Sequence, residues 1–174
     1  KRGLVETDVI IIDAKSGVTG AGRDHKPFAE CNEGMSAYKV AQHRHTPEIE
    51  QTLMKAANKR IRLTFVPHLL PINRGVSCTC YARLKLGVTE ERIRDAYNDF
   101  YSDEYFIRLL ESGETANVKN VRMSNMCEIS LHIDRRTGML IVTSAIDNMI
   151  KGSVGQAVQN MNIVMGLDER TGLD

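Results

Sequence analysis

Two histidines and two glutamates stand close together in QHRHTPEIEQ, residues 42–51. His43 and His45 have the spacing of a metal-ligating pair, but a metal site needs at least one further ligand, and no other histidine lies in a recognisable ligand motif. His45 and Glu48 lie three residues apart at the expected start of a helix, so their side chains can meet and the carboxylate can orient the imidazole. Glu48 can instead simply complement the positive end of that helix. The spacing therefore favours an acid–base pair or a helix cap over a metal site.

Two other stretches offer groups that hold anions. SGVTGAGR, residues 16–23, combines an arginine with glycines that let the backbone approach a ligand closely. Such a stretch can also be no more than a turn. PHLLPINRG, residues 67–75, offers Arg74, which would clamp a carboxylate or phosphate if buried and mean little if exposed. Both stretches are candidates for binding an anionic substrate.

Three segments have the apolar periodicity of amphipathic helices. The first begins inside the histidine stretch, with Thr46 as N-cap, Pro47 at the first helical position and an apolar stripe beyond them. Residues 89–101 form the second, which Thr89 caps. Residues 153–165 form the third, and its stripe of valines and methionines is expected to pack against the rest of the domain.

Extended segments rich in valine and isoleucine predict a sheet between these helices. Strands that neighbour one another in sequence favour an α+β fold, with a largely antiparallel mixed sheet and helices on one face. The other face is then free to meet a second copy or another domain. The predicted strands cover residues 4–17, 61–66, 76–86 and 105–110, residues 126–147 form a hairpin that turns near Gly138, and residues 67–75, with two prolines, are expected to be an irregular loop.

The chain has 174 residues, which suits one domain, and a formal net charge of +1 without a long basic run. The composition therefore predicts no nucleic-acid partner, and no apolar run reaches the length that spans a membrane. No secretory signal is visible, the chain begins at Lys1, and its cysteines form no CxxC pair, which together predict a processed or truncated cytoplasmic protein. Cys78 and Cys80 share one face of a strand and are expected to act as small apolar side chains.

Four stretches occur in an order that resembles the N-acetyl-gamma-glutamyl-phosphate reductase family of arginine biosynthesis. They are DAKSGVTGAGR, HRHTPEIEQ, FVPHLLPINRG and AIDNMIKGSVGQAVQNMNIVMGLDE, and the resemblance covers nearly the whole chain. Members of this family reduce a small-molecule acyl phosphate to an aldehyde with NADPH through a cysteine thioester. They share this plan with the aspartate-semialdehyde and glyceraldehyde-phosphate dehydrogenases. The resemblance implies a fold like the C-terminal domain of glyceraldehyde-phosphate dehydrogenase, and a homodimer or homotetramer.

The resemblance also implies roles for particular residues. His45 would be the acid–base group, Glu48 would hold its tautomer, and His43 would take a secondary role in the same cleft. Substrate binding would fall to Ser16, Gly17, Gly20, Gly22, Arg23 and Arg74. Contacts with the nicotinamide side of NADP would fall to Asn148, Lys151, Gly152 and Gln156, at the start of the last helix.

The chain departs from this family in two respects. It has no GxGxxG turn of a Rossmann domain, and none of its cysteines, Cys31, Cys78, Cys80 and Cys127, stands in the family's Gly-Cys-Tyr-Pro motif. Residues 1–174 are therefore expected to be the substrate-binding and dimerisation domain alone, with the nucleophile and the Rossmann NADP-binding domain outside the chain. Two other interpretations stay open, namely a metal-dependent hydrolase built on the HxH pair and a non-catalytic oligomerisation domain.

Overall fold

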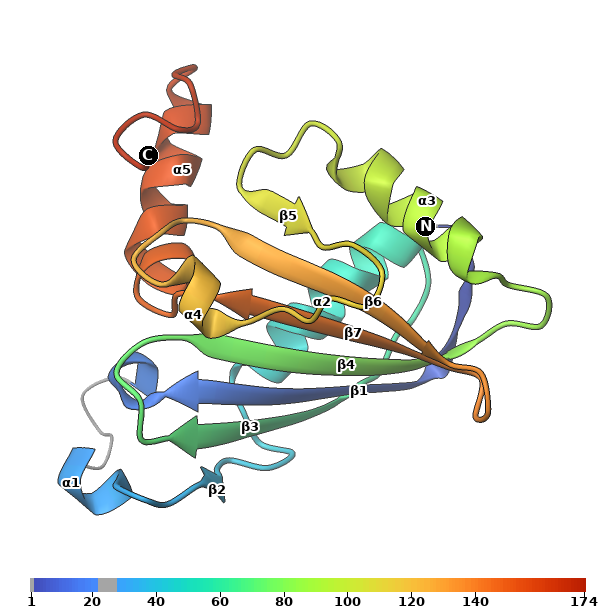
Figure 1. The fold of residues 1–174 in the computed structure, drawn as a ribbon, viewed down its shortest axis with the longest axis horizontal. Helices are drawn as coiled ribbons and strands as arrows, with labels where there is room; N and C mark the ends of the chain where they lie inside the picture. Colours follow the sequence, from blue (N-terminus) through green and yellow to red (C-terminus); the bar gives the residue numbers. More distant parts are fainter. Residues whose placement is uncertain (1, 22–27) are drawn as a thin grey trace.

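A computed structural model describes residues 2–21 and 28–174, and the strands within these ranges form one seven-stranded mixed sheet (Figure 1). The strands lie in the order β2-β3-β1-β4-β7-β6-β5. The β1–β3 and β5–β6 pairs are parallel and the other pairs are antiparallel, which confirms the predicted largely antiparallel mixed sheet. The bounds are β1 Val5–Gly17, β2 Ser36–Ala37, β3 Thr64–Leu70, β4 Val76–Leu84, β5 Ile107–Leu109, β6 Cys127–Asp134 and β7 Met139–Ile146.

The two longest helices of the described ranges lie on the same face of the sheet. These are α2 (His45–Ala57) and α3 (Glu90–Tyr101), and α2 passes behind the sheet in Figure 1. The short α4 (Val118–Val121) lies on the opposite face against β7. Helices therefore cover mainly one face, as the sequence predicts, with one short addition on the other. The other helical segments are η1 Val18–Ala21, α1 Phe28–Cys31, the π-helical η2 Ile150–Val154 and α5 Gly155–Val164.

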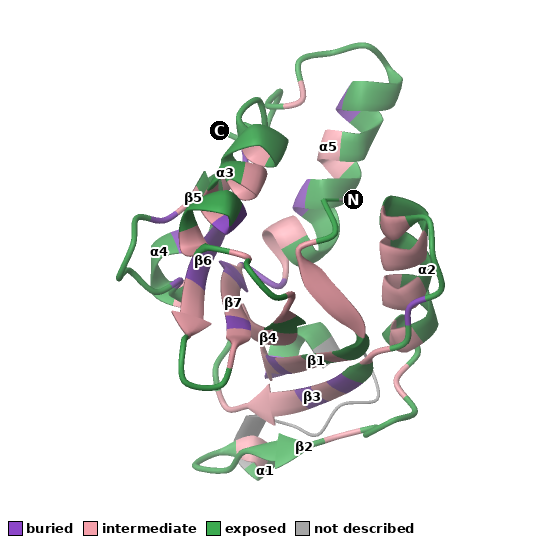
Figure 2. Cartoon of the chain, turned by 90° about the vertical axis from the view of Figure 1, so that its right-hand side faces the viewer, coloured by how far each residue is buried: buried purple, intermediate pink, exposed green. Residues whose placement is uncertain are grey.

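The main hydrophobic core lies between α3 and the strands β6 and β7 (Figure 2). Thr89 caps α3, as expected, because its hydroxyl accepts a hydrogen bond of 3.3 Å from the Arg92 N–H. The helix then buries Ile93 against Leu131 and Leu140 of the sheet. Each such side chain contributes about 1.5–3 kcal/mol by leaving water. This packing fixes one wall of the helix-bearing face.

The strand β3 continues through Pro67, so the prediction of an irregular loop from residue 67 is wrong. It also begins later than predicted, at Thr64 rather than at residue 61. Pro67 pairs with Ala14 of β1, while its carbonyl points to the other side and accepts a hydrogen bond of 3.0 Å from the Tyr38 N–H. A residue's N–H and carbonyl point to the same side of a strand, so the missing donor of Pro67 removes no bond to β1.

The apolar stripe of the last helix does not pack as the sequence predicts. Val154 is 56% exposed, Met161 54% and Val164 83%. The helix begins as the π-helical turn η2, and its buried positions are Gly155 and Asn162. The Asn162 side chain instead donates hydrogen bonds to carbonyls of the chain end that folds back on α5. A periodic apolar stripe shows which face of a helix favours burial. It does not show which other part of the protein packs on that face.

Within residues 2–21 and 28–174, every helix is too short or too polar to cross a lipid bilayer.

Candidate functional site

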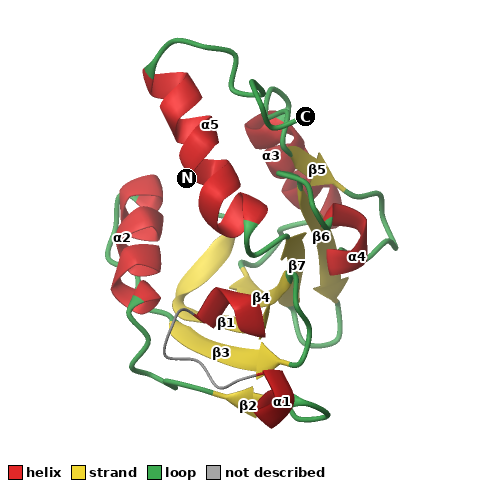
Figure 3. Cartoon of the chain, turned by 90° about the vertical axis from the view of Figure 1, so that its left-hand side faces the viewer, coloured by secondary structure: helices red, strands yellow, loops and turns green. Residues whose placement is uncertain are grey.

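Three segments that the sequence singles out meet at the end of the sheet where β1 stops, the end that faces the viewer in Figure 3. Gly17 donates its backbone N–H to the carbonyl of Gly75 at 2.9 Å. The Asn148 side chain accepts from the Gly75 N–H at 2.8 Å and donates to the Thr19 hydroxyl at 2.9 Å. The end of β1, the β3–β4 loop and the segment after β7 are thereby held together. The predicted anion-binding stretches and the first predicted cofactor residue therefore lie side by side, and they form the candidate site.

Close approach of backbones explains why glycines stand in the β1 turn. A Cβ atom on Gly17 would lie 2.6 Å from the carbonyl oxygen of Ile72, nearer than real Cβ contacts. A Cβ on Gly20 would lie 3.0 Å from the Asn148 amide nitrogen and 3.3 Å from the Ser16 hydroxyl. Any side chain at Gly17 would push the β3–β4 loop away, so the glycine is a requirement of the assembled site.

Asp147 is the residue of this site that sequence reasoning missed. Its carboxylate is fully buried and accepts backbone N–H bonds from Met123, Met149 and Ile150 at 2.8–3.0 Å. Arg74, whose side chain is 28% exposed, donates to the same carboxylate at 3.3 Å. Burial would raise the pKa of Asp147, but the three N–H donors and the Arg74 charge hold it below its ordinary value. Its signals in the sequence were an aspartate directly after an apolar strand and its place in the stretch AIDNMIKGSVGQAVQNMNIVMGLDE.

The sequence left open whether Arg74 is a buried anion-binding residue or an exposed residue without a role, and the structure shows neither. One nitrogen of its guanidinium is held by the buried Asp147 carboxylate. The rest of the guanidinium is partly exposed and has N–H donors for a second anion. The ion pair with Asp147 fixes the orientation of these exposed donors. This is an arrangement suited to holding a carboxylate or phosphate at the end of the sheet.

His43 and His45 form part of an aromatic cluster at the start of α2. The His43 ring packs edge-to-face on His45, Phe65 and Tyr38, with centroids 4.8, 5.2 and 5.6 Å away. Its Nδ1 accepts a hydrogen bond of 3.2 Å from the backbone N–H of His45, so the proton of the neutral ring is on Nε2. Burial, followed by the charges of His45 and nearby basic residues, lowers the pKa of His43. The neutral His43 ring therefore serves as the acceptor at this helix start.

The structure corrects the predicted start of α2. The helix begins at His45, so Thr46 and Pro47 lie inside its first turn, and the Thr46 hydroxyl is buried without a hydrogen-bond partner among the described residues. The imidazole of His43 instead accepts the N–H of His45, the first residue of the helix. The cap prediction is wrong because the chain is already helical at Thr46, whereas a capping residue must lie just outside the helix.

His45 and Glu48 are both exposed at the start of α2. Within the described part of the chain, no hydrogen bond or ion pair joins their side chains, so the pairing expected from their spacing is not formed directly. Both groups are open to a ligand.

The other predicted cofactor residues take different positions. Lys151 donates to Gln159 at 2.7 Å and lies 5.2 Å from the centre of the Phe106 ring, and burial lowers its pKa. Gln156 is exposed, and its side-chain oxygen accepts a hydrogen bond from Asn160, one turn further along α5. Gly152 is part of the π-helical turn and donates its N–H to the Asp147 carbonyl at 3.0 Å. Of the four predicted residues, Asn148 is thus the one whose side chain is hydrogen-bonded to both the β1 turn and the β3–β4 loop.

Two predicted substrate residues, Gly22 and Arg23, lie outside the described residues. In the described ranges, no group of three or more His, Cys, Asp and Glu side chains could hold a metal ion, so the HxH pair gains no third ligand there. Burial raises the pKa of Cys78 to about 12 and that of Cys80 to about 11, and it also raises that of Cys127. These three thiols stay protonated at neutral pH, which fits the expectation that Cys78 and Cys80 act as small apolar side chains.

A family model described as "Semialdehyde dehydrogenase, dimerisation domain" matches residues 1–148. The N-acetyl-gamma-glutamyl-phosphate reductase of Brachyspira hyodysenteriae is 55% identical over 171 residues, which are 96% of this chain and 49% of that protein. The reductase of the same name from Pelotomaculum thermopropionicum is 53% identical over 176 residues, which are 99% of this chain and 51% of that protein. The chain therefore spans about half the length of the curated relatives it matches.

Solved structures with the same fold have much lower sequence identity. Aspartate semialdehyde dehydrogenase from Francisella tularensis has a TM-score of 0.71 and 11% identity over 93% of this chain and 58% of its own. Aspartate semialdehyde dehydrogenase II from Vibrio cholerae has a TM-score of 0.68 and 13% identity over 92% of this chain and 56% of its own. At such identities the likeness concerns the fold alone, and it confirms the fold that the sequence implied.

Proposed function

The chain belongs to the family of semialdehyde dehydrogenase dimerisation domains, and we propose that it supplies the substrate-binding and dimerisation part of an N-acetyl-gamma-glutamyl-phosphate reductase. The reaction proposed for the whole enzyme is the reduction of N-acetyl-gamma-glutamyl phosphate to N-acetylglutamate semialdehyde with NADPH, a step of arginine biosynthesis. The observation that carries this proposal is the meeting of the Gly17 turn, Arg74 and Asn148 at one end of the sheet, in a chain about half identical to such reductases.

Substrate binding is assigned to that end of the sheet. The substrate carries anionic phosphate and carboxylate groups, and the partly exposed guanidinium of Arg74 offers charged donors to one of them. The turn that holds Ser16, Gly17 and Gly20 would add backbone groups to the same site. Gly22 and Arg23 extend this proposal along the sequence beyond the described part of the turn.

His45 is assigned the proton transfers of the reaction. Its exposed imidazole at the start of α2 can take a proton from an attacking thiol and deliver one to the departing oxygen. The neutral ring of His43 is its secondary partner, because it accepts the His45 N–H and packs against the His45 ring. Glu48 would orient His45 once a ligand draws the two side chains together. The nucleophilic cysteine is proposed to lie outside this chain, since burial keeps Cys78, Cys80 and Cys127 protonated.

NADP, which supplies the hydride when bound, is proposed to be held mainly by a domain outside this chain. Asn148 fits a contact at the nicotinamide side, since its amide lies in the site and retains one N–H beyond the bond to Thr19. Lys151 and Gln156 would have to leave Gln159 and Asn160 to take part in such a contact.

A homodimer or homotetramer of a cytoplasmic enzyme is the proposed setting. The name of the matched family supports self-association, and the free thiols of Cys78, Cys80 and Cys127 suit a reducing compartment. Light scattering at micromolar concentration tests the first point on the 174-residue chain, and a monomer would show that other parts of the protein are needed.

Two assays test the proposed reaction. The 174-residue chain should reduce no NADP with N-acetylglutamate semialdehyde and phosphate, and turnover near that of an intact enzyme would place the nucleophile inside this chain. In the longer protein, His45→Asn should lower turnover by about 10²–10⁴-fold, the usual contribution of a general acid–base group. A loss below tenfold would contradict the role of His45. Zinc bound to the purified chain would revive the metal-dependent alternative.

A further inference from the structure

The segment between β5 and β6 packs on the loop that carries Arg74. It includes α4, which lies on the sheet face opposite α2 and α3 (Figure 1). Val118, the first residue of α4, lies directly against Gly75 of the β3–β4 loop, because a Cβ atom on Gly75 would be only 2.7 Å from the Val118 Cβ. Gly75 follows Arg74 in the chain. The position of α4 therefore limits where the loop with Arg74 can lie.

The same segment also reaches the guanidinium of Arg74, through Asp147. The Met123 N–H, just beyond α4, donates to Asp147 Oδ2 at 2.9 Å, and Arg74 donates to Oδ1 of the same carboxylate at 3.3 Å. Met123 has a φ of 62°, which is unfavourable for a residue with a side chain. It is also 65% exposed, so its bond to Asp147, rather than side-chain packing, accounts for this conformation. Both the backbone and the side chain of Arg74 thus depend on the segment that carries α4.

Glu128 of β6 holds the start of α4 on the sheet. Its side chain is 1% exposed, and its Oε2 accepts the Asn117 N–H at 3.1 Å and the Asn120 side-chain amide at 3.2 Å. Its Oε1 accepts from Arg108, whose side chain is 53% exposed, at 3.1 Å. Without the carboxylate, the buried donors of the α4 segment would lose their acceptor, and an unpaired buried donor is unfavourable. Glu128 therefore fixes where α4 sits.

We propose that Glu128 and Val118 are positioning residues for Arg74. Glu128 fixes α4, and α4 fixes the loop through Val118 and the guanidinium through the Met123 N–H. Both act through Arg74, which would meet the anionic group of the substrate itself. The inference rests on the proposed function in one respect, namely that Arg74 binds such a group. It adds a fourth segment to the three that meet in the candidate site.

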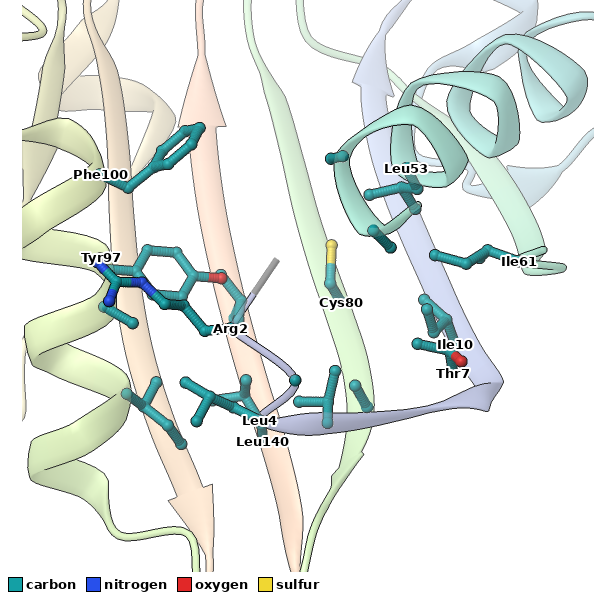
Figure 4. Close-up of a pocket in the computed structure, with 18 of the residues that line it drawn as sticks. Arg2, Leu4, Thr7, Ile10, Leu53, Ile61, Cys80, Tyr97, Phe100 and Leu140 are labelled. Carbon is teal, nitrogen blue, oxygen red and sulfur yellow. The ribbon is translucent and has the colours of Figure 1, made fainter. Parts of the chain in front are cut away.

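The first test compares two valine-to-alanine variants of the 174-residue chain. Val118→Ala removes the side chain that abuts Gly75. Val142→Ala makes the same change on the other face of the sheet, in the pocket that it lines with Cys80 and Leu140 (Figure 4). Both valines are partly buried against hydrophobic clusters, so both variants should lose stability. Val118→Ala alone should raise the dissociation constant of inorganic phosphate, by roughly three- to tenfold, as for residues that are energetically coupled. Equal phosphate affinities in the two variants would overturn the proposal.

Phosphate binding is followed by NMR at Arg74 itself. The Arg74 Nε–H resonance is assigned by its loss in Arg74→Lys, and it should shift when phosphate is added to the unaltered chain. Its order parameter should fall in Val118→Ala and stay unchanged in Val142→Ala, because only the first variant frees the loop. An unchanged order parameter in Val118→Ala would refute the positioning role. If phosphate leaves the resonance unmoved in the unaltered chain, the substrate-binding role of Arg74 in the proposed function fails instead, and the order parameter still decides the positioning role.

The second test separates positioning from a general loss of stability. In Glu128→Gln, the amide oxygen can face Asn117 and Asn120, and the amide nitrogen then faces the partly exposed Arg108, which can turn to water. This variant should bind phosphate nearly as the unaltered chain does. Glu128→Leu offers no acceptor and should bind phosphate as weakly as Val118→Ala. Equal affinities in the two Glu128 variants would overturn the proposal, and if Glu128→Leu does not fold, the valine pair decides.

Discussion

Replacing Asp147 by asparagine would convert one oxygen of a fully buried carboxylate into an amide nitrogen. Oδ1 of Asp147 accepts from the backbone N–H groups of Met149 and Ile150 and from Arg74, whereas Oδ2 accepts from the Met123 N–H. An asparagine can keep its oxygen toward the first group of donors. Its nitrogen then faces the Met123 N–H, so that donor loses its partner inside the protein.

The structure sets the size of this effect. One hydrogen bond to a charged group is lost and one buried N–H is left unsatisfied, which together cost about 2–4 kcal/mol. For a domain of this length such a loss lowers the unfolding midpoint by roughly 5–15 °C. The opposite orientation of the amide would leave three donors unsatisfied and is worse. The Asp147→Asn variant should therefore lose much of the stability of the domain.

Thermal unfolding followed by circular dichroism measures this loss. Asp168→Asn is the matched control, because it makes the same chemical change at an exposed carboxylate that pairs with Arg170 on the surface. The control should leave the midpoint nearly unchanged, since exposed ion pairs contribute little. If the two variants unfold at the same temperature, the argument from buried acceptors is refuted.

The same carboxylate predicts a pH dependence. The pKa of Asp147 is lowered in the fold from its ordinary value of 3.8, so its stabilising contribution is present above pH 3.8 and is lost as the pH falls through the lower, folded value. Urea unfolding from pH 7 to pH 2 should show the difference between wild type and Asp147→Asn narrowing below pH 3.8. A difference that stays constant over this range would contradict the lowered pKa.

Three further outcomes are expected. Gly17→Ala should destabilise the domain by about 1–3 kcal/mol, because its Cβ would lie 2.6 Å from the Ile72 carbonyl oxygen, whereas Gly152→Ala meets no heavy atom nearer than 3.3 Å and should be tolerated. Urea titrations of both variants measure this, and equal costs would contradict the close approach. Thr89→Ala should cost about 1 kcal/mol, because it removes a true helix cap, whereas Thr46→Ala should cost less, because its hydroxyl has no partner among the described residues. The reverse order would restore Thr46 as the cap. In alkylation with iodoacetamide at pH 7.5, the half-buried thiols of Cys78 and Cys80, whose pKa values are raised, should react far more slowly than in the urea-unfolded chain, and equal rates would show that they are ionised or accessible.

Local patterns in the sequence predicted the helices and strands that are determined by the residues within them. The helix α3 follows from its Thr89 cap and its apolar stripe, and both are observed. The hairpin of β6 and β7 turns at Gly138, whose φ of 69° suits glycine in a tight turn. The residue types of the anion-binding stretches and of the histidine stretch also led to the prediction of a site at the end of the sheet and at the start of α2, and this stays a prediction.

Tertiary structure decided the points that depend on distant partners. Thr19 and Asn148 are 129 residues apart in sequence, and their hydrogen bond joins the β1 turn to the segment after β7. Pro67 stays inside a strand because its missing N–H lies on the side away from β1, and the helix start expected at Thr46 lies at His45, whose N–H bonds to His43. Asp147 gains its role from donors on three separate segments. The periodicity of apolar residues predicts which face of a helix or strand is buried. The hydrogen-bond partner of each buried polar group depends instead on which distant segments pack next to it.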